Sequence, residues 1–140
     1  MTFGTDEPRE VDFDLVTQEV GEGTFVVALT GEVDLYTAPE LKAALLRLVA
    51  EGPSRIVVDL SGATFVDSTT LGVLLGAVKR LRLIGGELVL VCADLNIRRI
   101  LSITLLDRAF TIYESLDVAL RSQPLAEVKQ SSPEQPQGLA

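Results

Sequence analysis

Residues 56–91 read IVVDLSGATFVDSTTLGVLLGAVKRLRLIGGELVLV and carry the clearest secondary-structure pattern of the chain. Its first apolar run predicts a buried strand over 55–60, and ELVLVCA predicts a second buried strand over 87–93. Between them, apolar residues at helical spacing predict a helix over 68–83, which the following Gly-Gly pair ends. A strand, a helix and a strand in this order indicate a parallel β-α-β unit. The predicted apolar stripe of the helix consists of Leu71, Leu74, Leu75 and Val78.

The connection SGATFV and the first turn of this helix are rich in polar residues. Ser, Thr and Asp side chains accept hydrogen bonds from the free amides of a first helical turn, so we expect Asp67 or Ser68 to be the N-cap. Capping does not explain Gly72 and Gly76, because each glycine costs about 1 kcal/mol relative to alanine inside a helix.

A strip of small residues runs along one face of the same helix. Thr69, Gly72, Val73 and Gly76 stand at positions i, i+3, i+4 and i+7, beside the apolar stripe. Such a smooth strip allows another backbone to approach closely. Two interpretations are open: the strip receives a second protein, or it receives a neighbouring helix of the same domain.

The segments on either side predict further strands and helices. FDLVTQEV and EGTFVVALT predict a hairpin, with the second strand buried on both faces. Thr37 and Glu40 then predict a capping box for a helix that ends at Gly52. Downstream, DLNIRRILSIT predicts a short helix capped by Asp94, FTIYES a last strand and LDVAL a closing helix. The first of these helices has the apolar stripe Leu41, Ala44, Leu45, Leu48 and Val49.

Together these elements predict an α/β fold. We expect a mixed sheet of about five strands with β-α-β crossovers, an antiparallel hairpin at its start and about four helices. Loops that follow parallel strands meet at one edge of a sheet, where open α/β sheets place functional groups. The loops GEVDLYT, SGATFVDS and ADLN are therefore expected to gather Asp34, Asp67, Ser68 and Asp94.

Length and charge limit the possible functions. The 140 residues fit one domain, expected over 10–121 between a flexible N-terminus at 1–9 and a disordered tail at 122–140. The formal net charge of −8 argues against direct nucleic-acid binding and against anionic lipid. The sequence contains neither a secretion signal nor an apolar run long enough to cross a membrane, so we expect a cytoplasmic protein with no membrane partner.

The absence of histidine removes the commonest general base and a frequent metal ligand. Serine-histidine triads, cysteine-histidine pairs and the usual zinc sites are excluded, and we expect no catalytic residue, metal or cofactor. The single cysteine, Cys92, lies in an apolar run and is expected to be a buried free thiol.

Two chemistries remain open for the expected cluster of polar residues. Its three acids could bind Mg²⁺ and accept a phosphoryl group on aspartate, as in receiver domains, although the initial hairpin and the lack of a suitably placed Lys near FTIYES argue against this. Alternatively, Ser68 is the reactive group. Phosphorylation there would add a charge of about −1.5 to −2 beside Asp67 and Asp34.

Three separated motifs carry a family resemblance. GEVDLYTAPEL, the stretch 56–91 quoted above and IRRILSITLLD are similar, in sequence and order, to the STAS domain of bacterial anti-sigma factor antagonists. The resemblance covers about residues 10–121. Ser68 matches the serine of the family motif D-S-[ST]-G-L-G, and Asp34 matches the Asp of the motif G-E-[IVL]-D. The chain departs from the family at Thr70, where the motif has Gly.

The resemblance implies a binding protein that is not an enzyme. It implies that the unphosphorylated form binds an anti-sigma factor that is itself a serine kinase, and thereby frees a sigma factor. Phosphorylation of Ser68 by this kinase would end binding, and a metal-dependent serine phosphatase would restore it. The alternative is a STAS module that binds proteins or a small ligand without a phosphorylation cycle. We expect a monomer or weak dimer whose partner-binding residues are Asp34, Asp67, Ser68, Thr69, Gly72, Val73 and Gly76.

The C-terminal segment is predicted to contribute little to stability, because it has three prolines and few large apolar residues. Deleting residues 125–140 should change the melting temperature by no more than a few degrees, since about 1 kcal/mol corresponds to roughly 3 to 6 °C. Calorimetry of the full-length and shortened chains measures this. A large drop would show that the segment packs on the domain.

Overall fold

The alternating residues near the N-terminus form the expected hairpin, in which strands β1 and β2 are antiparallel. The computed structural model describes residues 13–122, so the segment 1–9 and all of the segment 122–140 except Ser122 lie outside the described residues. The connecting turn places Gly23 at φ +75°, a conformation that glycine adopts without a side-chain clash. The described strands are β1 (Phe13–Gly21), β2 (Thr24–Val33), β3 (Arg55–Val66), β4 (Glu87–Val91) and β5 (Thr111–Tyr113).

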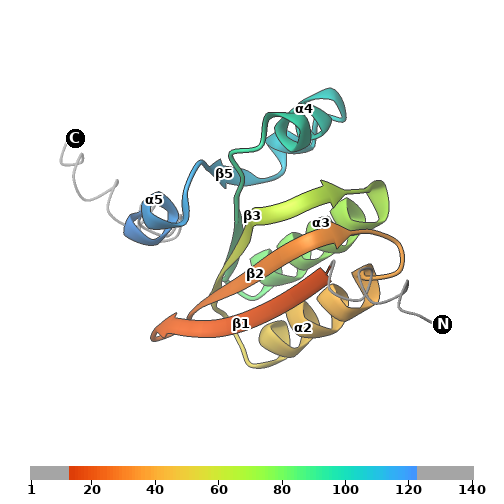
Figure 1. The fold of residues 1–140 in the computed structure, drawn as a ribbon. Coiled ribbons are helices and arrows are strands. Elements are labelled where there is room, and N and C mark those ends of the chain that lie inside the picture. The colour runs from red at the N-terminus through yellow and green to blue at the C-terminus, as the bar shows by residue number, and fades with distance from the viewer. Residues whose placement is uncertain (1–12, 123–140) are drawn as a thin grey trace.

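These five strands form one mixed sheet, as predicted, and their order in it is β1-β2-β3-β4-β5 (Figure 1). The pairs from β2 to β5 are parallel, and helices connect them. In the described residues the helices are α2 (Ala38–Ala50), α3 (Ser68–Leu83), α4 (Leu95–Ile103) and α5 (Leu116–Arg121), with a short 3₁₀ turn at Leu106–Arg108.

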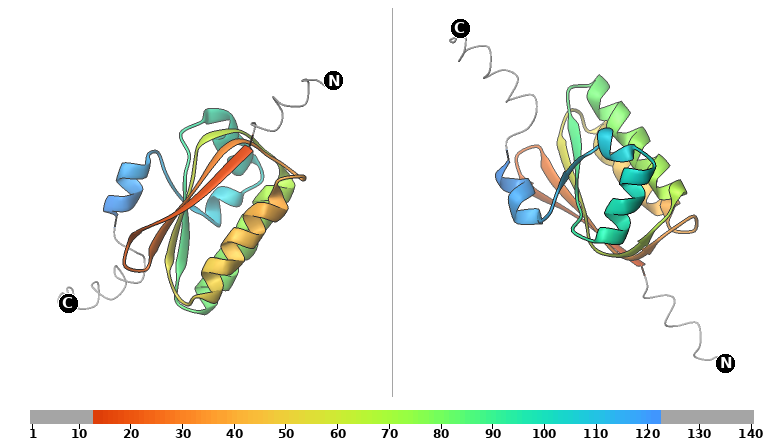
Figure 2. Two further views of the ribbon diagram at one scale, coloured as in Figure 1. Left: turned by 60° about the horizontal axis from the view of Figure 1, so that its bottom comes forward. Right: turned by 90° about the horizontal axis from the view of Figure 1, so that it is seen from above.

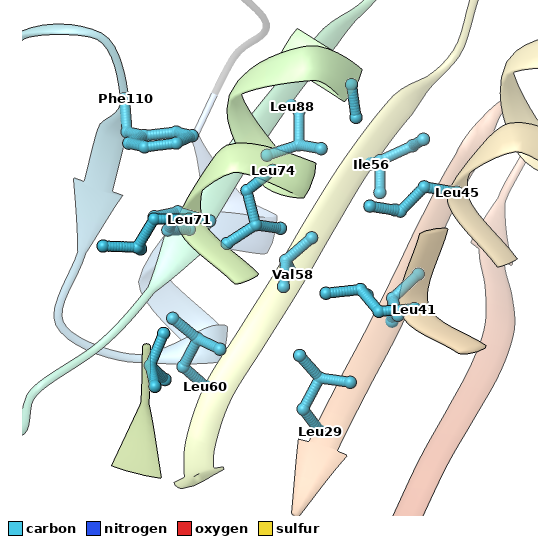
Figure 3. Close-up of a cluster of buried hydrophobic side chains, with 14 of the residues drawn as sticks. Leu29, Leu41, Leu45, Ile56, Val58, Leu60, Leu71, Leu74, Leu88 and Phe110 are labelled. Carbon is cyan, nitrogen blue, oxygen red and sulfur yellow. The ribbon is translucent and has the colours of Figure 1, made fainter. Parts of the chain in front are cut away.

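The main core lies between the sheet and helices α2, α3 and α4 (Figure 3). Alternate residues of β3 point to opposite faces, so Ile56, Val58 and Leu60 face these helices while Val57 faces α5. Helix α5 therefore covers the other face of the sheet, as Figure 2 shows. This helix follows the last strand of the sheet and is not a crossover, so it is free of the constraint that keeps the other three helices on one face.

Strand β3 is longer than predicted. The segment SGATFV, expected to be a connection, continues the strand to Val66 and pairs with the end of β2, where Ala63 faces Gly31 and Val66 faces Val33. Strand β4 pairs with β3 only as far as Asp59, so residues 60–66 extend beyond it. The prediction missed this because the segment has no continuous apolar run and its strand character depends on backbone pairing with β2.

The opposite end of the sheet, where β3 and β4 begin, is closely packed. The Arg55 guanidinium donates to the Glu87 carboxylate at 2.7 Å, and both side chains are largely buried. The Glu87 amide donates to the Ser54 carbonyl at 3.0 Å. Gly86 lies against the same backbone, since a Cβ at this position would be 2.5 Å from the Ser54 carbonyl oxygen.

This close approach predicts that Gly86→Ala destabilises the domain by about 1–3 kcal/mol, because the backbone of residue 54 must move. Urea unfolding followed by circular dichroism measures the change. Gly76→Ala is the matched control, since a Cβ there meets no atom within 4 Å. Equal stability of the two variants would contradict the packing described here.

Candidate functional site

The loops after β2 and β3 lie together at one edge of the sheet. Val33 and Val66 end these strands and face each other, so Asp34 and Asp67 follow at neighbouring positions. The Val33 carbonyl accepts a hydrogen bond from the Asp67 amide at 3.3 Å and another from the Thr70 hydroxyl at 2.9 Å. These bonds fix the start of α3 against the end of β2.

Asp67 is the N-cap of α3. Its carboxylate accepts hydrogen bonds from the Thr70 amide at 3.0 Å and the Thr70 hydroxyl at 3.1 Å. Ser68 follows as the first residue of the helix and is exposed. Within the described residues its hydroxyl makes no hydrogen bond, because Asp67 already provides the cap. Ser68 is therefore an exposed serine whose hydroxyl has no hydrogen-bond partner within residues 13–122.

Thr70 points into the domain. The side chain is 0% exposed, and its hydroxyl bonds to Val33 and Asp67. The position at which the family motif has glycine thus faces inward, and the extra side chain of Thr70 adds nothing to the outer surface of α3.

Asp34 organises the turn that leads into α2. Its carboxylate accepts hydrogen bonds from the amides of Tyr36 at 3.0 Å and Thr37 at 3.2 Å, while its own amide donates to the Thr37 hydroxyl at 2.8 Å. The predicted capping box of Thr37 and Glu40 is wrong, because the Thr37 side chain turns back to Asp34 and caps no helical amide. The turn holds Leu35 and Tyr36 in solvent, 58% and 86% exposed.

A groove between α2 and α3 runs from the start of α3 along the predicted strip. Its volume is about 280 Å³. Within residues 13–122 a Cβ added at Gly72 or Gly76 would meet no atom within 4 Å, so these glycines are not needed to admit a neighbouring helix of the described domain, and that interpretation is wrong. The groove is lined by Lys42, Leu45, Leu46, Thr69, Gly72, Val73, Gly76, Ala77 and Arg80.

Two exposed residues that line the groove were not predicted from the sequence. Lys42 and Leu46 lie on the surface of α2, beside the apolar stripe whose Leu45 is buried as expected. The exposed Leu35 and Tyr36 had no periodic pattern to mark them. The available signal was a pair of large apolar residues inside an otherwise polar loop, GEVDLYT.

Asp94 does not join the other acids. It follows β4, which ends beside Asp59, whereas Asp67 follows the part of β3 that extends through residues 60–66. Asp67 stands eight residues beyond the last pair of β3 with β4, Asp59 and Val91, and Asp94 only three residues beyond it, so at about 3.3 Å per residue the offset along the strands is up to about 16 Å. Asp94 instead caps α4, accepting from the amides of Asn96 at 2.8 Å and Ile97 at 3.0 Å. The expected gathering of Asp94 with Asp34, Asp67 and Ser68 is therefore wrong.

This separation removes the geometric basis of the receiver-like interpretation. Among residues 13–122, no group of three or more His, Cys, Asp or Glu side chains could hold a metal ion. Cys92 is buried, as expected, and burial raises the pKa of its thiol. No helix in the same part of the chain is long and apolar enough to cross a membrane.

The fold and this surface define a small α/β domain with an open groove beside an exposed helix start. The STAS domain family model matches residues 16–119. An anti-sigma-B factor antagonist of Staphylococcus aureus (strain NCTC 8325 / PS 47) is 33% identical over 94 residues, which are 67% of this chain and 87% of that protein. The chain therefore belongs to the STAS domain family.

Solved structures agree with this assignment. The crystal structure of an anti-sigma factor antagonist from Mycobacterium paratuberculosis has a TM-score of 0.66 and 33% identity, covering 77% of this chain and 91% of that chain. The anti-sigma factor antagonist SpoIIAA in its unphosphorylated form has a TM-score of 0.64 and 18% identity, covering 76% and 94%. At the latter identity the likeness concerns the fold alone.

The open space beside the two glycines predicts that alanine there stabilises the fold. Gly72→Ala and Gly76→Ala should each raise the free energy of unfolding by up to about 1 kcal/mol, because alanine has the higher helix propensity and no atom of the domain obstructs its Cβ. Thermal and urea unfolding of the single variants measure this gain. Destabilisation by either variant would show that another part of the chain fills the groove.

Proposed function

We propose that this protein is an anti-sigma factor antagonist that acts by binding and is controlled by phosphorylation. In this proposal the unphosphorylated form binds an anti-sigma factor serine kinase and so releases a sigma factor. Phosphorylation of Ser68 ends binding. The observation that carries the proposal is an exposed serine whose hydroxyl is not used by the fold, at the start of a helix that borders an open groove.

The binding half of the proposal rests on the surface around this serine. Gly72 and Gly76 leave room for the close approach of a partner backbone. Thr69 and Val73 line the same groove. Leu35 and Tyr36, held by the Asp34 turn, add large exposed apolar side chains of the kind that anchor protein interfaces. Asp34 acts in this scheme as a positioning residue, since its carboxylate holds the turn.

The switching half follows from charge. A phosphate on Ser68 would add about −1.5 to −2 beside Asp67, on a surface that must lose water when a partner binds. The amides at the start of α3 and the helix dipole favour a negative charge there, so the domain itself tolerates the modification. The phosphate therefore weakens the complex while the fold remains intact.

The remaining expectations for this protein are part of the same proposal. A metal-dependent serine phosphatase resets the switch by hydrolysing the phosphate on the exposed Ser68. The protein is cytoplasmic, needs no cofactor, catalyses no reaction and is a monomer or weak dimer. Its partners do not include nucleic acid or membrane.

Substitution of Ser68 tests the switch. Ser68→Ala should keep the affinity for the kinase within about tenfold of wild type, ~1.4 kcal/mol, and should block phosphate uptake. Ser68→Asp should bind at least about tenfold more weakly, because the added charge beside Asp67 must lose its water when the partner binds. Titration calorimetry against the anti-sigma factor kinase measures affinity, and intact mass after incubation with kinase and ATP measures phosphorylation.

Ser102→Asp is the matched control, since it adds the same charge at an exposed position of α4, away from the groove. It should bind like wild type. Equal affinities for the alanine and aspartate variants of Ser68, or phosphate on the alanine variant, would rule out the proposed switch. Tight binding with no phosphate uptake by wild type would support a STAS module without a phosphorylation cycle.

A further inference from the structure

The groove between α2 and α3 has an unusual charge for this protein. The whole chain has a formal net charge of −8, yet the residues that line the groove include Lys42 from α2 and Arg80 from α3 and no acid. Helix α3 itself contains no Asp or Glu. An acidic protein therefore presents a local cationic site beside an apolar surface.

These two cations have no partner within the described residues. Neither forms an ion pair with another side chain in 13–122. The residues three and four positions away on the same helix are apolar: Ala38, Pro39, Leu45 and Leu46 around Lys42, and Gly76, Ala77, Leu83 and Ile84 around Arg80. Since charged neighbours on a helix stand at these spacings, neither cation is neutralised by an acid three or four positions away along its own chain segment.

We infer that this groove receives an acidic, apolar segment of the protein partner, with Lys42 and Arg80 selecting its acidic side chains. The inference deepens the proposed function and rests on it, because it assigns the chemistry of the segment that the anti-sigma factor kinase inserts. Leu46 and Val73 supply apolar contact at the surface, and the glycines admit the backbone of the segment. Charge complementarity at such a site sets partner choice more than overall affinity, because an unsuitable partner must bury an unpaired or like charge.

A nucleic acid fits this groove less well than an acidic protein segment. Phosphate-backbone binding needs an extended basic surface, and two cations on a domain of this acidity do not provide one. The apolar contact residues and the two glycines suit side chains and a peptide backbone instead.

Charge reversal tests the inference on the full chain. Lys42→Glu and Arg80→Glu should each weaken binding of the anti-sigma factor kinase by about tenfold, with a smaller loss at high salt because exposed charges are screened. Lys79→Glu is the matched control: it makes the same charge change at an exposed position of α3 that does not line the groove, and should stay within about threefold of wild type. Circular dichroism checks that all three variants fold.

The outcomes separate this inference from the proposed switch. If both groove variants bind like Lys79→Glu while Ser68→Asp remains weak, the inference is wrong and the switch stands. If the groove variants are weak while the two Ser68 variants bind equally, the inference stands and the switch is wrong.

A second measurement needs no kinase. A soluble peptide that alternates leucine and glutamate, titrated into isotope-labelled protein, should shift the amide resonances of Thr69, Gly72 and Gly76. The double variant of Lys42→Glu and Arg80→Glu should abolish these shifts, and a peptide with lysine in place of glutamate should produce none. Equal shifts from both peptides, shifts confined to other surfaces, or shifts caused only by a poly-anion such as single-stranded DNA would overturn the inference.

Discussion

The carbonyl oxygen of Val33 holds the functional edge of this domain together. It accepts hydrogen bonds from the backbone of Asp67 and the side chain of Thr70, and so joins the end of one strand to the start of a helix that follows the next strand. Thr70 is fully buried, so the interaction is shielded from water. Because these hydrogen bonds to Val33 fix the start of α3, Asp67 can cap the helix, and Ser68 is exposed to solvent next to the turn that Asp34 organises.

Much of the fold was predictable because its signals are local. Helical spacing in α3 and the apolar runs of the parallel strands need no knowledge of distant contacts, and α3 begins at Ser68 and ends at Leu83 as expected. The errors concern contacts that no sequence pattern marks. The extension of β3 depends on pairing with β2, and the Thr37 hydroxyl accepts from the Asp34 amide, three residues earlier, instead of capping α2. The inward orientation of Thr70 likewise depends on Val33, 37 residues earlier.

The candidate surface was predictable in part for the same reason. The strip of Thr69, Gly72, Val73 and Gly76 is a pattern along one helix, and the structure places all four beside the groove. The contribution of α2 was missed, since no sequence pattern states which face of one helix lies next to another. The expectation that Asp94 joins this surface was wrong, because β3 extends well beyond the end of β4 through its pairing with β2.

The buried thiol of Cys92 makes it possible to follow local unfolding of the domain by the rate at which this thiol is alkylated. The side chain is fully buried between β4 and α4, the backbone of this residue bonds to Tyr113 and Arg98, and burial raises the thiol pKa. Thiolate is the form that reacts with alkylating reagents. The folded protein therefore slows alkylation of the Cys92 sulfur in two ways: burial keeps the reagent out, and the raised pKa keeps the thiol protonated. Since the chain has no other cysteine, its rate of alkylation in native buffer follows the opening that exposes the connection between β4 and α4, without any added label.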